Sequence, residues 1–526
     1  MKKRLPNDIR EKILAILKSP LFQGIFLFLV LAALFLPYHR YQINVDGVSY
    51  LSIAQKYIQL DFTNAVNGYW SPLYSWLLIP LLLGGISPLL ASKLLSIAIG
   101  LASLVSTNSI LNKFNLNIWL HRTALFIMAI VVLFHAFNLI TPDLLFACIG
   151  LALVNRTLEL SCSNRTKTAV ITGILGGLLY LSKSYGLPFF IVTFFLINVI
   201  FFFRTKEKKE RNRVLKNYVL SMLLFLLIGG SWIMVLSSKY GYVTWNTSGP
   251  YNHAYIGPSG WSHPMGHIGL LPPPNETAIS VWEDPINIPV IQWNIFENSQ
   301  TFKYYRNTVW NNIKISMGYL NLFSLFCIPI LAGILINLLW KKKKMFFEHS
   351  LLLLIFLFVS VMGYTLIVCE LRYIILANFI LILLGIHLLN IIFNKIPSFT
   401  IPKIVLVLVF SLSFIYQARY LYQYKNMGKE FYETQKRIAS LNIHGKVASM
   451  KDWNFGQFSS FYHGWRYYGI VSSNSNSDPE AELKQYGIDY FIVSDDWEKM
   501  EQFRFLHSYD KVTQDSFLGF YIFKMK

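Results

Sequence analysis

The sequence predicts a polytopic α-helical membrane protein with a small α/β domain at its C-terminal end. Of its 526 residues, 54% are hydrophobic and only 14% are charged, whereas a soluble domain carries about 25% charged residues. Several stretches approach the roughly 20 apolar residues that a hydrocarbon core of about 30 Å requires. These stretches are residues 21–36, 189–203, 217–236, 351–368 and 374–392.

One apolar segment, residues 71–85, decides the expected topology. Only about a dozen of its residues lie between polar edges, which is short for a span, and Pro80 interrupts it. We expect it to be interfacial or re-entrant. The chain then crosses the membrane about eleven times. The expected spans are residues 21–37, 88–109, 119–138, 143–158, 168–183, 187–203, 217–236, 313–339, 349–368, 374–393 and 402–420.

The basic residues support this choice of topology. They are concentrated between apolar runs, as in residues 204–216 and 341–344, and such clusters are typical of cytoplasmic loops. If residues 71–85 crossed the membrane, every later cluster would face outward. The formal charge of +20 therefore reflects membrane orientation, and we exclude nucleic acid as a partner because no basic surface interleaved with aromatic residues is present.

The N-terminal residues are basic and then apolar, like a signal peptide, but no small-residue cleavage site follows. We expect a retained first helix, a cytoplasmic N-terminus and a multi-pass protein of the inner (plasma) membrane. Residues 1–420 would form the membrane domain, with outer loops at 38–87 and 237–312. Residues 421–526 would form an extracytoplasmic domain.

This tail alternates short β-like runs with helical patterns, and about 100 residues suffice for a small α/β domain. The expected strands are residues 446–449, 468–472, 490–493 and 517–523, and the expected helices are residues 429–441 and 478–486.

Asp46 is the first candidate for chemistry, since an ionisable group at membrane depth or at a helix end is a functional candidate by default. It follows the first apolar run, and a helix starting there places Asp46, Tyr50 and Tyr57 on one side. A carboxylate in this position could take a proton from an acceptor hydroxyl. The alternative is that Asp46 only caps that helix.

Asp143 is the second candidate, in the run Ile-Thr-Pro-Asp at the expected outer start of a span. Capping and the helix dipole again offer an alternative explanation. Two acidic residues on one outer face could share acceptor activation or position a divalent cation, and the residues alone do not separate these roles.

Two isolated cations, Lys183 and Arg372, lie at expected outer turns whose surroundings are poor in basic residues. A lipid phosphate is a natural partner, because Arg binds it bidentately and Lys binds it as a point charge. The alternative is an ordinary ion pair. For Arg372 the partner would be Glu370, Asp46 or Asp143.

The long outer loop is rich in tryptophan. Aromatic faces suit sugar stacking, yet membrane anchoring explains most tryptophans at an interface. His263 and His267 have metal-like spacing, but the intervening Pro264 and Gly266 argue against a helix there. The four cysteines are scattered and predict neither a disulfide framework nor a zinc site. The tryptophans are Trp245, Trp261, Trp282 and Trp293.

Taken together, these motifs resemble the GT-C glycosyltransferases, most closely the bacterial protein-mannosyltransferase and aminoarabinose-transferase group (glycosyltransferase family 39 and relatives). The likeness covers roughly residues 20–395. Each motif is weak by itself, and their order on one outer face makes the set specific. The motifs are Asp46-Gly-Val-Ser-Tyr50, Asn67-Gly-Tyr-Trp-Ser-Pro-Leu73, Thr141-Pro-Asp143, Tyr180-Leu-Ser-Lys183 and Glu370-Leu-Arg-Tyr373.

The resemblance implies an inverting transfer of sugar from a polyprenyl-phosphate carrier. It assigns Asp46 as catalytic base or acceptor-positioning group and Asp143 as the second acidic residue. Lys183 and Arg372 would hold the carrier phosphate. Many members have two adjacent acidic residues where this chain has Asp46 followed by glycine, so a divalent cation is left open and no metal ligand is assigned. The predicted substrate-binding residues are Tyr50, Lys183, Glu370, Arg372 and Tyr373.

The predicted function is therefore a polyprenyl-phosphate-sugar-dependent hexosyl or pentosyl transferase acting outside the cytoplasm. Its partners would be the lipid-linked sugar donor, membrane lipids and a lipid, glycan or protein acceptor. A lipid-linked sugar transporter is the alternative from another class, although paired interrupted half-helices in two related halves are not visible. A non-catalytic envelope-assembly protein on the same scaffold is a further alternative. The residues identify neither the sugar nor the acceptor.

Overall fold

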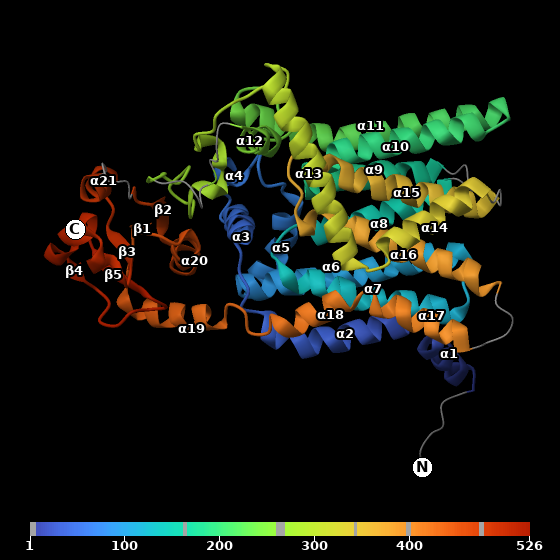
Figure 1. Cartoon of the computed structure of the whole chain (residues 1–526), viewed down its shortest axis with the longest axis horizontal. Helices are drawn as coiled ribbons and strands as arrows, with labels where there is room; N and C mark the ends of the chain where they lie inside the picture. Colours follow the sequence, from blue (N-terminus) through green and yellow to red (C-terminus); the bar gives the residue numbers. More distant parts are fainter. Residues whose placement is uncertain are drawn as a thin grey trace, which may run out of the picture.

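A computed structural model shows a bundle of long helices with a small sheet at one end (Figure 1). It describes residues 7–160, 166–258, 263, 269–340, 344–395, 401–472 and 478–526. Trp261, His267, Cys162 and most of the basic cluster at 341–344 lie outside these ranges. The first helix α1 and the C-terminal sheet lie at opposite ends of the bundle (Figure 1).

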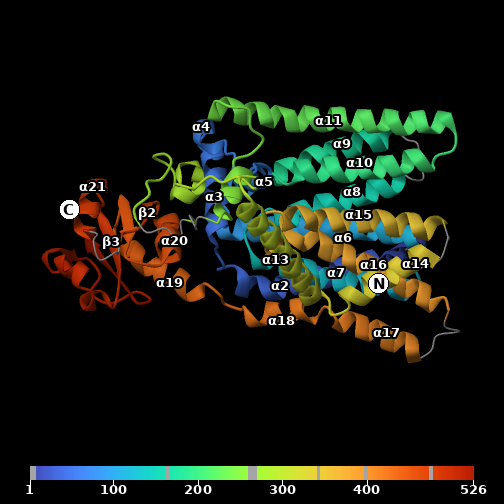
Figure 2. The same cartoon turned by 45° about the horizontal axis from the view of Figure 1, so that its top comes forward.

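Most helices of the bundle are apolar and run roughly side by side, while α13 crosses them, as both views show (Figures 1 and 2). Its helices are α1 (Asn7–Lys18), α2 (Pro20–His39), α5 (Leu73–Leu83), α6 (Pro88–Leu111), α7 (Ile118–Asn138), α8 (Asp143–Leu160), α9 (Thr166–Ser182), α10 (Gly186–Arg204), α11 (Lys208–Tyr240), α13 (Ser299–Phe323), α14 (Cys327–Trp340), α15 (Lys344–Thr365), α16 (Ile375–Phe393), α17 (Ile401–Leu412) and α18 (Ile415–Gln423). A 3-10 turn, η1 (Asn112–Phe114), follows α6.

The length and composition of these helices make this a multi-pass membrane protein. Among the described residues, 6 helices are long and apolar enough to cross a bilayer, or up to 8 if each of two bent pairs is one span. Helix α5 has only 11 residues, about 17 Å at about 1.5 Å per residue, which is too short for a core of about 30 Å. The structure thus agrees with a non-crossing segment at residues 71–85, while the count of eleven and the inside–outside orientation stay predictions.

Two of the expected spans are broken. In place of a straight span at 313–339, α13 begins at Ser299 and meets α14 at 99°, and the span at 402–420 is divided into α17 and α18 at 44°. Ser324 leaves the helical conformation and accepts a hydrogen bond from the Phe326 amide (3.3 Å). The two breaks meet, because the Ser324 and Ser413 hydroxyls lie 3.2 Å apart and the Leu325 amide donates to the Ser413 carbonyl (3.4 Å). Each break thereby satisfies polar groups of the other.

Short helices and loops cover the end of the bundle nearest the sheet (Figure 2). The helix expected after the first span is α3, and η3, more than 220 residues further along the sequence, lies against it. These elements are α3 (Val45–Ile58), α4 (Phe62–Ala65), α12 (Ser248–Tyr255), η3 (Val281–Glu283), η4 (Pro285–Asn287) and η5 (Leu371–Ile374).

The C-terminal region, residues 429–526, contains the small sheet that its composition predicts. The strand order is β2-β1-β3-β5-β4, with β1 parallel to β2 and β3, and β5 antiparallel to β3 and β4. The unpredicted helix α20 connects β1 to β2. The elements are α19 (Lys429–Ile438), η6 (Ala439–Leu441), β1 (Lys446–Ser449), α20 (Trp453–His463), β2 (Arg466–Ile470), α21 (Pro479–Tyr486), β3 (Tyr490–Ser494), η7 (Trp497–Lys499), η8 (Glu501–Ser508), β4 (Asp510–Lys511) and β5 (Phe520–Lys524).

The C-terminal region packs against the end of the bundle. Helix α20 contacts α3, and Trp453 and Tyr467 are buried in the same apolar core as the membrane helices. Two short segments of the loop between α12 and α13 lie along strand β2, where the Leu271 amide donates to the Tyr468 carbonyl (2.7 Å). The sheet is therefore in contact with the loops that surround α3.

Candidate active site

The bundle end contains a cavity of about 460 Å³ between α3, the start of α8, the turn after α9, α12 and η5. Residues from many separate parts of the chain line it, including the loop residues Trp70 and Trp282. All seven predicted site residues are among them, which brings together positions more than 320 residues apart in the sequence. These residues are Asp46, Tyr50, Asp143, Lys183, Glu370, Arg372 and Tyr373.

Asp46 lies in the first turn of α3, and its carboxylate interacts with side chains from other segments. It forms an ion pair with Arg372 and accepts a hydrogen bond from the Trp282 indole N–H (3.1 Å). Burial raises the pKa of Asp46, but the positive charge of Arg372 and these hydrogen bonds outweigh it, so the pKa is below its ordinary value. Asp46 is therefore an ionised carboxylate facing the cavity, beyond any capping role.

Asp143 and Lys183 form a second ion pair in the same cavity. Asp143 starts α8 and is only 5% exposed. The Lys183 ammonium also lies over the rings of Tyr373 (3.8 Å to the centroid) and Tyr364 (4.9 Å). A cation between a carboxylate and two ring faces is held in place by electrostatic attraction from both sides.

Arg372 connects the acidic residues, because all three partners proposed for it from the sequence surround it. Besides Asp46, its Nε lies 2.8 Å from Glu370 Oε2 and 4.0 Å from Asp143 Oδ2. The guanidinium also stands over the Tyr373 ring at 5.1 Å. Three carboxylates thus share two cations, Arg372 and Lys183, in one buried cluster.

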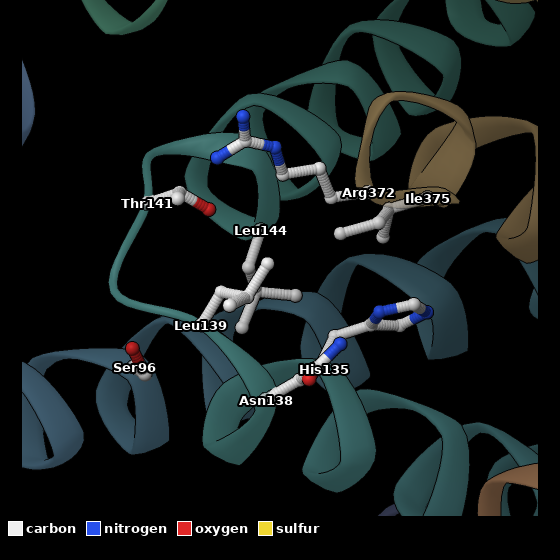
Figure 3. Close-up of a pocket in the computed structure, with 8 residues that line it drawn as sticks. All are labelled: Ser96, His135, Asn138, Leu139, Thr141, Leu144, Arg372 and Ile375. Atoms are coloured by element: carbon white, nitrogen blue, oxygen red, sulfur yellow. The ribbon is translucent and has the colours of Figure 1, made fainter. Parts of the chain in front are cut away.

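A much smaller cavity of about 10 Å³ lies on the other side of Arg372, with Thr141, His135 and Asn138 around it (Figure 3). Such a volume holds about one water molecule. The His135 Nε2 atom is buried and makes no hydrogen bond within the described residues, so a water molecule fits this space. The space excludes a sugar, and the larger cavity is the candidate substrate site.

Aromatic rings form one wall of the larger cavity. Tyr50 packs edge-on against Trp70 and Tyr74 (5.1 and 5.4 Å between centroids). Trp282 lies 5.2 Å from Tyr69 and 4.5 Å from His263. A wall of this kind offers apolar faces next to the charged cluster.

Trp282 is a candidate site residue that the sequence did not single out. Membrane anchoring was the expected role of most outer-loop tryptophans, but Trp282 is buried, lines the cavity and donates to Asp46. A signal was available, because Trp282 is followed directly by Glu283 and Asp284, and paired carboxylates do not suit a ring that inserts into lipid. Trp245 also lines the cavity.

Tyr57 does not belong to the site, although helical spacing places it on the side of Asp46. It packs against Phe62 and Trp76 instead. Eleven residues along a helix correspond to about 16 Å, and the cavity does not extend that far along α3. The helix-face argument therefore places Tyr50 in the cavity correctly, but it does not hold for Tyr57.

The described residues contain no group of three or more His, Cys, Asp or Glu side chains arranged to hold a metal ion. Asp46 and Asp143 each already bind a cationic side chain. His263 packs against Trp282, and burial lowers its pKa. This donor set does not fit a divalent cation held by the protein alone.

Comparison with solved structures identifies the fold. The structure of ArnT from Cupriavidus metallidurans bound to undecaprenyl phosphate superposes with a TM-score of 0.57 at 12% sequence identity, covering 95% of this chain and 98% of ArnT. ArnT in the apo state gives 0.54 with the same identity and coverage. The chain has the GT-C fold, which confirms the resemblance at the level of fold. No family model and no curated protein matches the sequence.

Proposed function

We propose that this protein transfers a sugar from a polyprenyl-phosphate carrier to an acceptor on the outer side of the membrane. One observation carries the proposal. Two acidic and two basic residues from four segments meet in one cavity at the bundle end, paired as Asp46–Arg372 and Asp143–Lys183. ArnT, which shares the fold, was solved with undecaprenyl phosphate bound, and this supports a carrier of that class here.

Arg372 and Lys183 would hold the carrier phosphate. A guanidinium has five N–H donors, so Arg372 can bind phosphate oxygens while keeping its bond to Asp46. Lys183 supplies a point charge next to it. When the bond between the sugar and the phosphate breaks, the phosphate leaves with an additional negative charge, and nearby fixed cations stabilise that charge as it develops.

Asp46 would take the proton of the acceptor. The acceptor oxygen attacks the anomeric carbon from the face opposite the phosphate, the anomeric C–O bond to the phosphate breaks, and the acceptor proton passes to the Asp46 carboxylate. The configuration inverts, and the transition state resembles an oxocarbenium ion. Asp143 would keep Lys183 oriented toward the phosphate. The bond from Trp282 would hold the orientation of the Asp46 carboxylate at the cavity.

The aromatic wall would hold the sugar ring. Tyr50, Tyr69 and Trp282 present ring faces and edges beside the charged cluster, and pyranose C–H faces pack well on such surfaces. Tyr373 connects the aromatic wall to the charged cluster. Its ring contacts Lys183 and Arg372, and its hydroxyl donates a hydrogen bond to Glu370 (3.1 Å).

The test follows labelled sugar in membranes that contain wild type, Asp46→Asn or Asp46→Ala at matched levels. A panel of radiolabelled polyprenyl-phosphate sugars serves as donors, and the label is traced into lipid, glycan and protein fractions. We expect transfer by wild type and its loss in both variants. The labelled fraction then gives the acceptor class.

Asp61→Asn is the matched control. Asp61 lies on the same outer end and caps α4 by accepting from the Asn64 amide (3.3 Å), outside the cavity. Its variant should keep wild-type transfer. Full transfer by both Asp46 variants would remove Asp46 as the base, and absence of transfer from every donor would contradict the proposed activity.

A further inference from the structure

A third buried ion pair lies outside the cavity, and the proposed chemistry makes no use of it. The Lys56 ammonium pairs with the Glu283 carboxylate, with side chains that are 2% and 3% exposed. The same carboxylate accepts from the Ser52 hydroxyl (2.7 Å). Taking two charges out of water costs several kcal/mol per ion before pairing, so a pair this deeply buried calls for a reason.

Glu283 directly follows Trp282 in the sequence, and this neighbour suggests why the buried pair is present. The Trp282 carbonyl accepts from the Trp70 indole (3.1 Å) and the Ser49 hydroxyl (3.4 Å). The Glu283 carbonyl accepts from the Asn67 amide nitrogen (2.6 Å). The loop is thus tied to α3 and the turn after it at several consecutive atoms, and Trp282 leaves this anchored backbone toward Asp46.

Asp46 and Lys56 are on the same helix, α3 (Val45–Ile58). Ten residues separate them, which corresponds to about 15 Å along the axis. Ser49 and Ser52 lie between and bond to the same two loop residues. The side chains at 46, 49, 52 and 56 follow helical spacing, so one face of α3 holds Trp282 and Glu283 along its whole length.

The C-terminal region holds the loop from the other side. The Gly269 amide donates to the Ile470 carbonyl (3.0 Å), and the Tyr467 amide donates to the Ile279 carbonyl (2.7 Å). Ser280 forms a parallel bridge with Tyr467. The loop therefore occupies the edge of strand β2, where backbone groups would otherwise be free to pair. Residues 269–283 are fixed between the sheet and α3.

We propose that Lys56 and Glu283 are positioning residues for the transfer reaction: their ion pair, with the edge of β2, holds the Trp282 indole N–H on the Asp46 carboxylate. This inference rests on the proposed function, in which Asp46 is the base. It gives the C-terminal region a role, because the sheet becomes one of the two supports of a cavity wall. Neither Lys56 nor Glu283 touches the substrate.

A structural role alone would have a different signature. If the pair only stabilised the fold, its loss would reduce the amount of folded protein and leave the pH dependence of the remaining activity unchanged. If it positions Trp282, its loss weakens the hydrogen bond to Asp46. A hydrogen bond to the charged form of a carboxyl lowers its pKa, so the pKa of Asp46 rises, and the acid limb of the pH profile moves to higher pH.

The variants are Lys56→Met, Glu283→Gln, the double variant and Trp282→Phe. Each of the first two should lower kcat by at least about 10-fold, and the acid limb of kcat/KM should move in the same direction as in Trp282→Phe. The kcat of the double variant should lie within about 3-fold of that of the more active single variant. Losses within one network are non-additive, and the double variant leaves no unpaired charge buried.

Lys451→Met is the control, since it removes a comparable but exposed pair with Asp496 (2.8 Å) in the C-terminal region. Its rate and pH profile should match wild type. A Lys56→Met protein that folds and keeps the wild-type acid limb would overturn the proposal. So would independent, multiplying losses in the double variant.

Hydrogen exchange separates this inference from the proposed function. Lys56→Met should accelerate amide exchange at residues 279–283 and at Tyr467, measured by mass spectrometry on the full chain in detergent, while Lys451→Met should not. If wild type transferred no sugar but this difference appeared, the activity would be wrong and the anchoring of Trp282 would stand. Unchanged exchange in Lys56→Met would overturn the anchoring itself.

Discussion

Helix α3 carries two buried charge clusters that differ in composition and surroundings. Near its first turn, Asp46 belongs to a cluster of three carboxylates on two cations that lines a cavity of about 460 Å³. Near its last turn, Lys56 meets a single carboxylate, Glu283, away from the cavity. The first cluster has an excess of negative charge and space beside it, and the second is balanced and closed.

This difference shows how a candidate ligand-binding cluster can be distinguished from a structural ion pair on the same helix. A balanced buried pair whose polar atoms are all occupied has nothing left to offer a ligand. A cluster in which Arg372 divides its donors between several carboxylates, beside open space, can exchange partners. Burial and charge are shared by both clusters, so neither property identifies the site alone.

The largest expected effect is on activity at the first cluster. Asp46→Asn should lower kcat/KM for sugar transfer by about 10³-fold, because general-base catalysis contributes about 10² to 10⁴-fold. Transfer of labelled sugar in matched membranes measures it. Asp61→Asn should stay within about 2-fold of wild type, and an equal loss in both variants would contradict a specific role for Asp46.

For the free energy of unfolding, the second cluster should matter more than the first. Lys56→Met leaves Glu283 buried without its partner, and breaking a buried pair from one side costs about 3–5 kcal/mol. Asp46→Asn should change the free energy of unfolding by less than about 1 kcal/mol, because Arg372 keeps Glu370 and Asp143 as partners. Thermal unfolding in detergent compares the two. A larger loss in Asp46→Asn than in Lys56→Met would contradict this assignment.

Arg372→Lys tests whether the fork of the guanidinium, and not only its charge, matters. The variant keeps one positive charge but loses the geometry that spans a carboxylate and a phosphate. We expect kcat/KM to fall by about 10²-fold, comparable to losing one donor to a developing anion. Lys314→Arg, a change among the exposed cations of α13, should leave it unchanged.

The smallest effect is the pH dependence of stability. Because the pKa of Asp46 is lowered in the folded protein, its contribution is complete above the ordinary carboxyl value of about 4 and is lost as pH falls through the lower folded value. Unfolding temperatures of wild type and Asp46→Asn at pH 7 and near pH 3 test the sign. Wild type should lose more on acidification than the variant, and the opposite ranking would show that the pKa of Asp46 is raised.

Local composition was sufficient to predict the membrane class, the non-crossing segment at 71–85 and the short strands of the tail. Each depends on composition within a window of about 20 residues. The breaks in α13–α14 and α17–α18 were not predicted, because each is satisfied by polar groups of the other, 89 residues away for Ser324 and Ser413. A periodicity argument sees only one helix at a time.

The candidate site divides in the same way. Asp46, Asp143, Lys183 and Arg372 could be selected because a charge at the edge of an apolar run is costly and therefore conspicuous. The residues after Trp282 argue against lipid anchoring, but they do not point to Asp46, because the two side chains meet across 236 residues of chain. Lys56 and Glu283 were overlooked for the same reason, because their pairing joins positions 227 residues apart.

The sequence alone determined that this is a multi-pass membrane protein, which of its charges lie at the ends of apolar runs and that a small α/β region follows the last of these runs. These properties are local, and burial of apolar side chains enforces them residue by residue. Only the tertiary structure decided which carboxylate faces which cation, that the aromatic wall borders that cluster and that β2 supports the wall through residues 269–283. Those are long-range pairings, and their geometry is set by how the whole bundle end packs together.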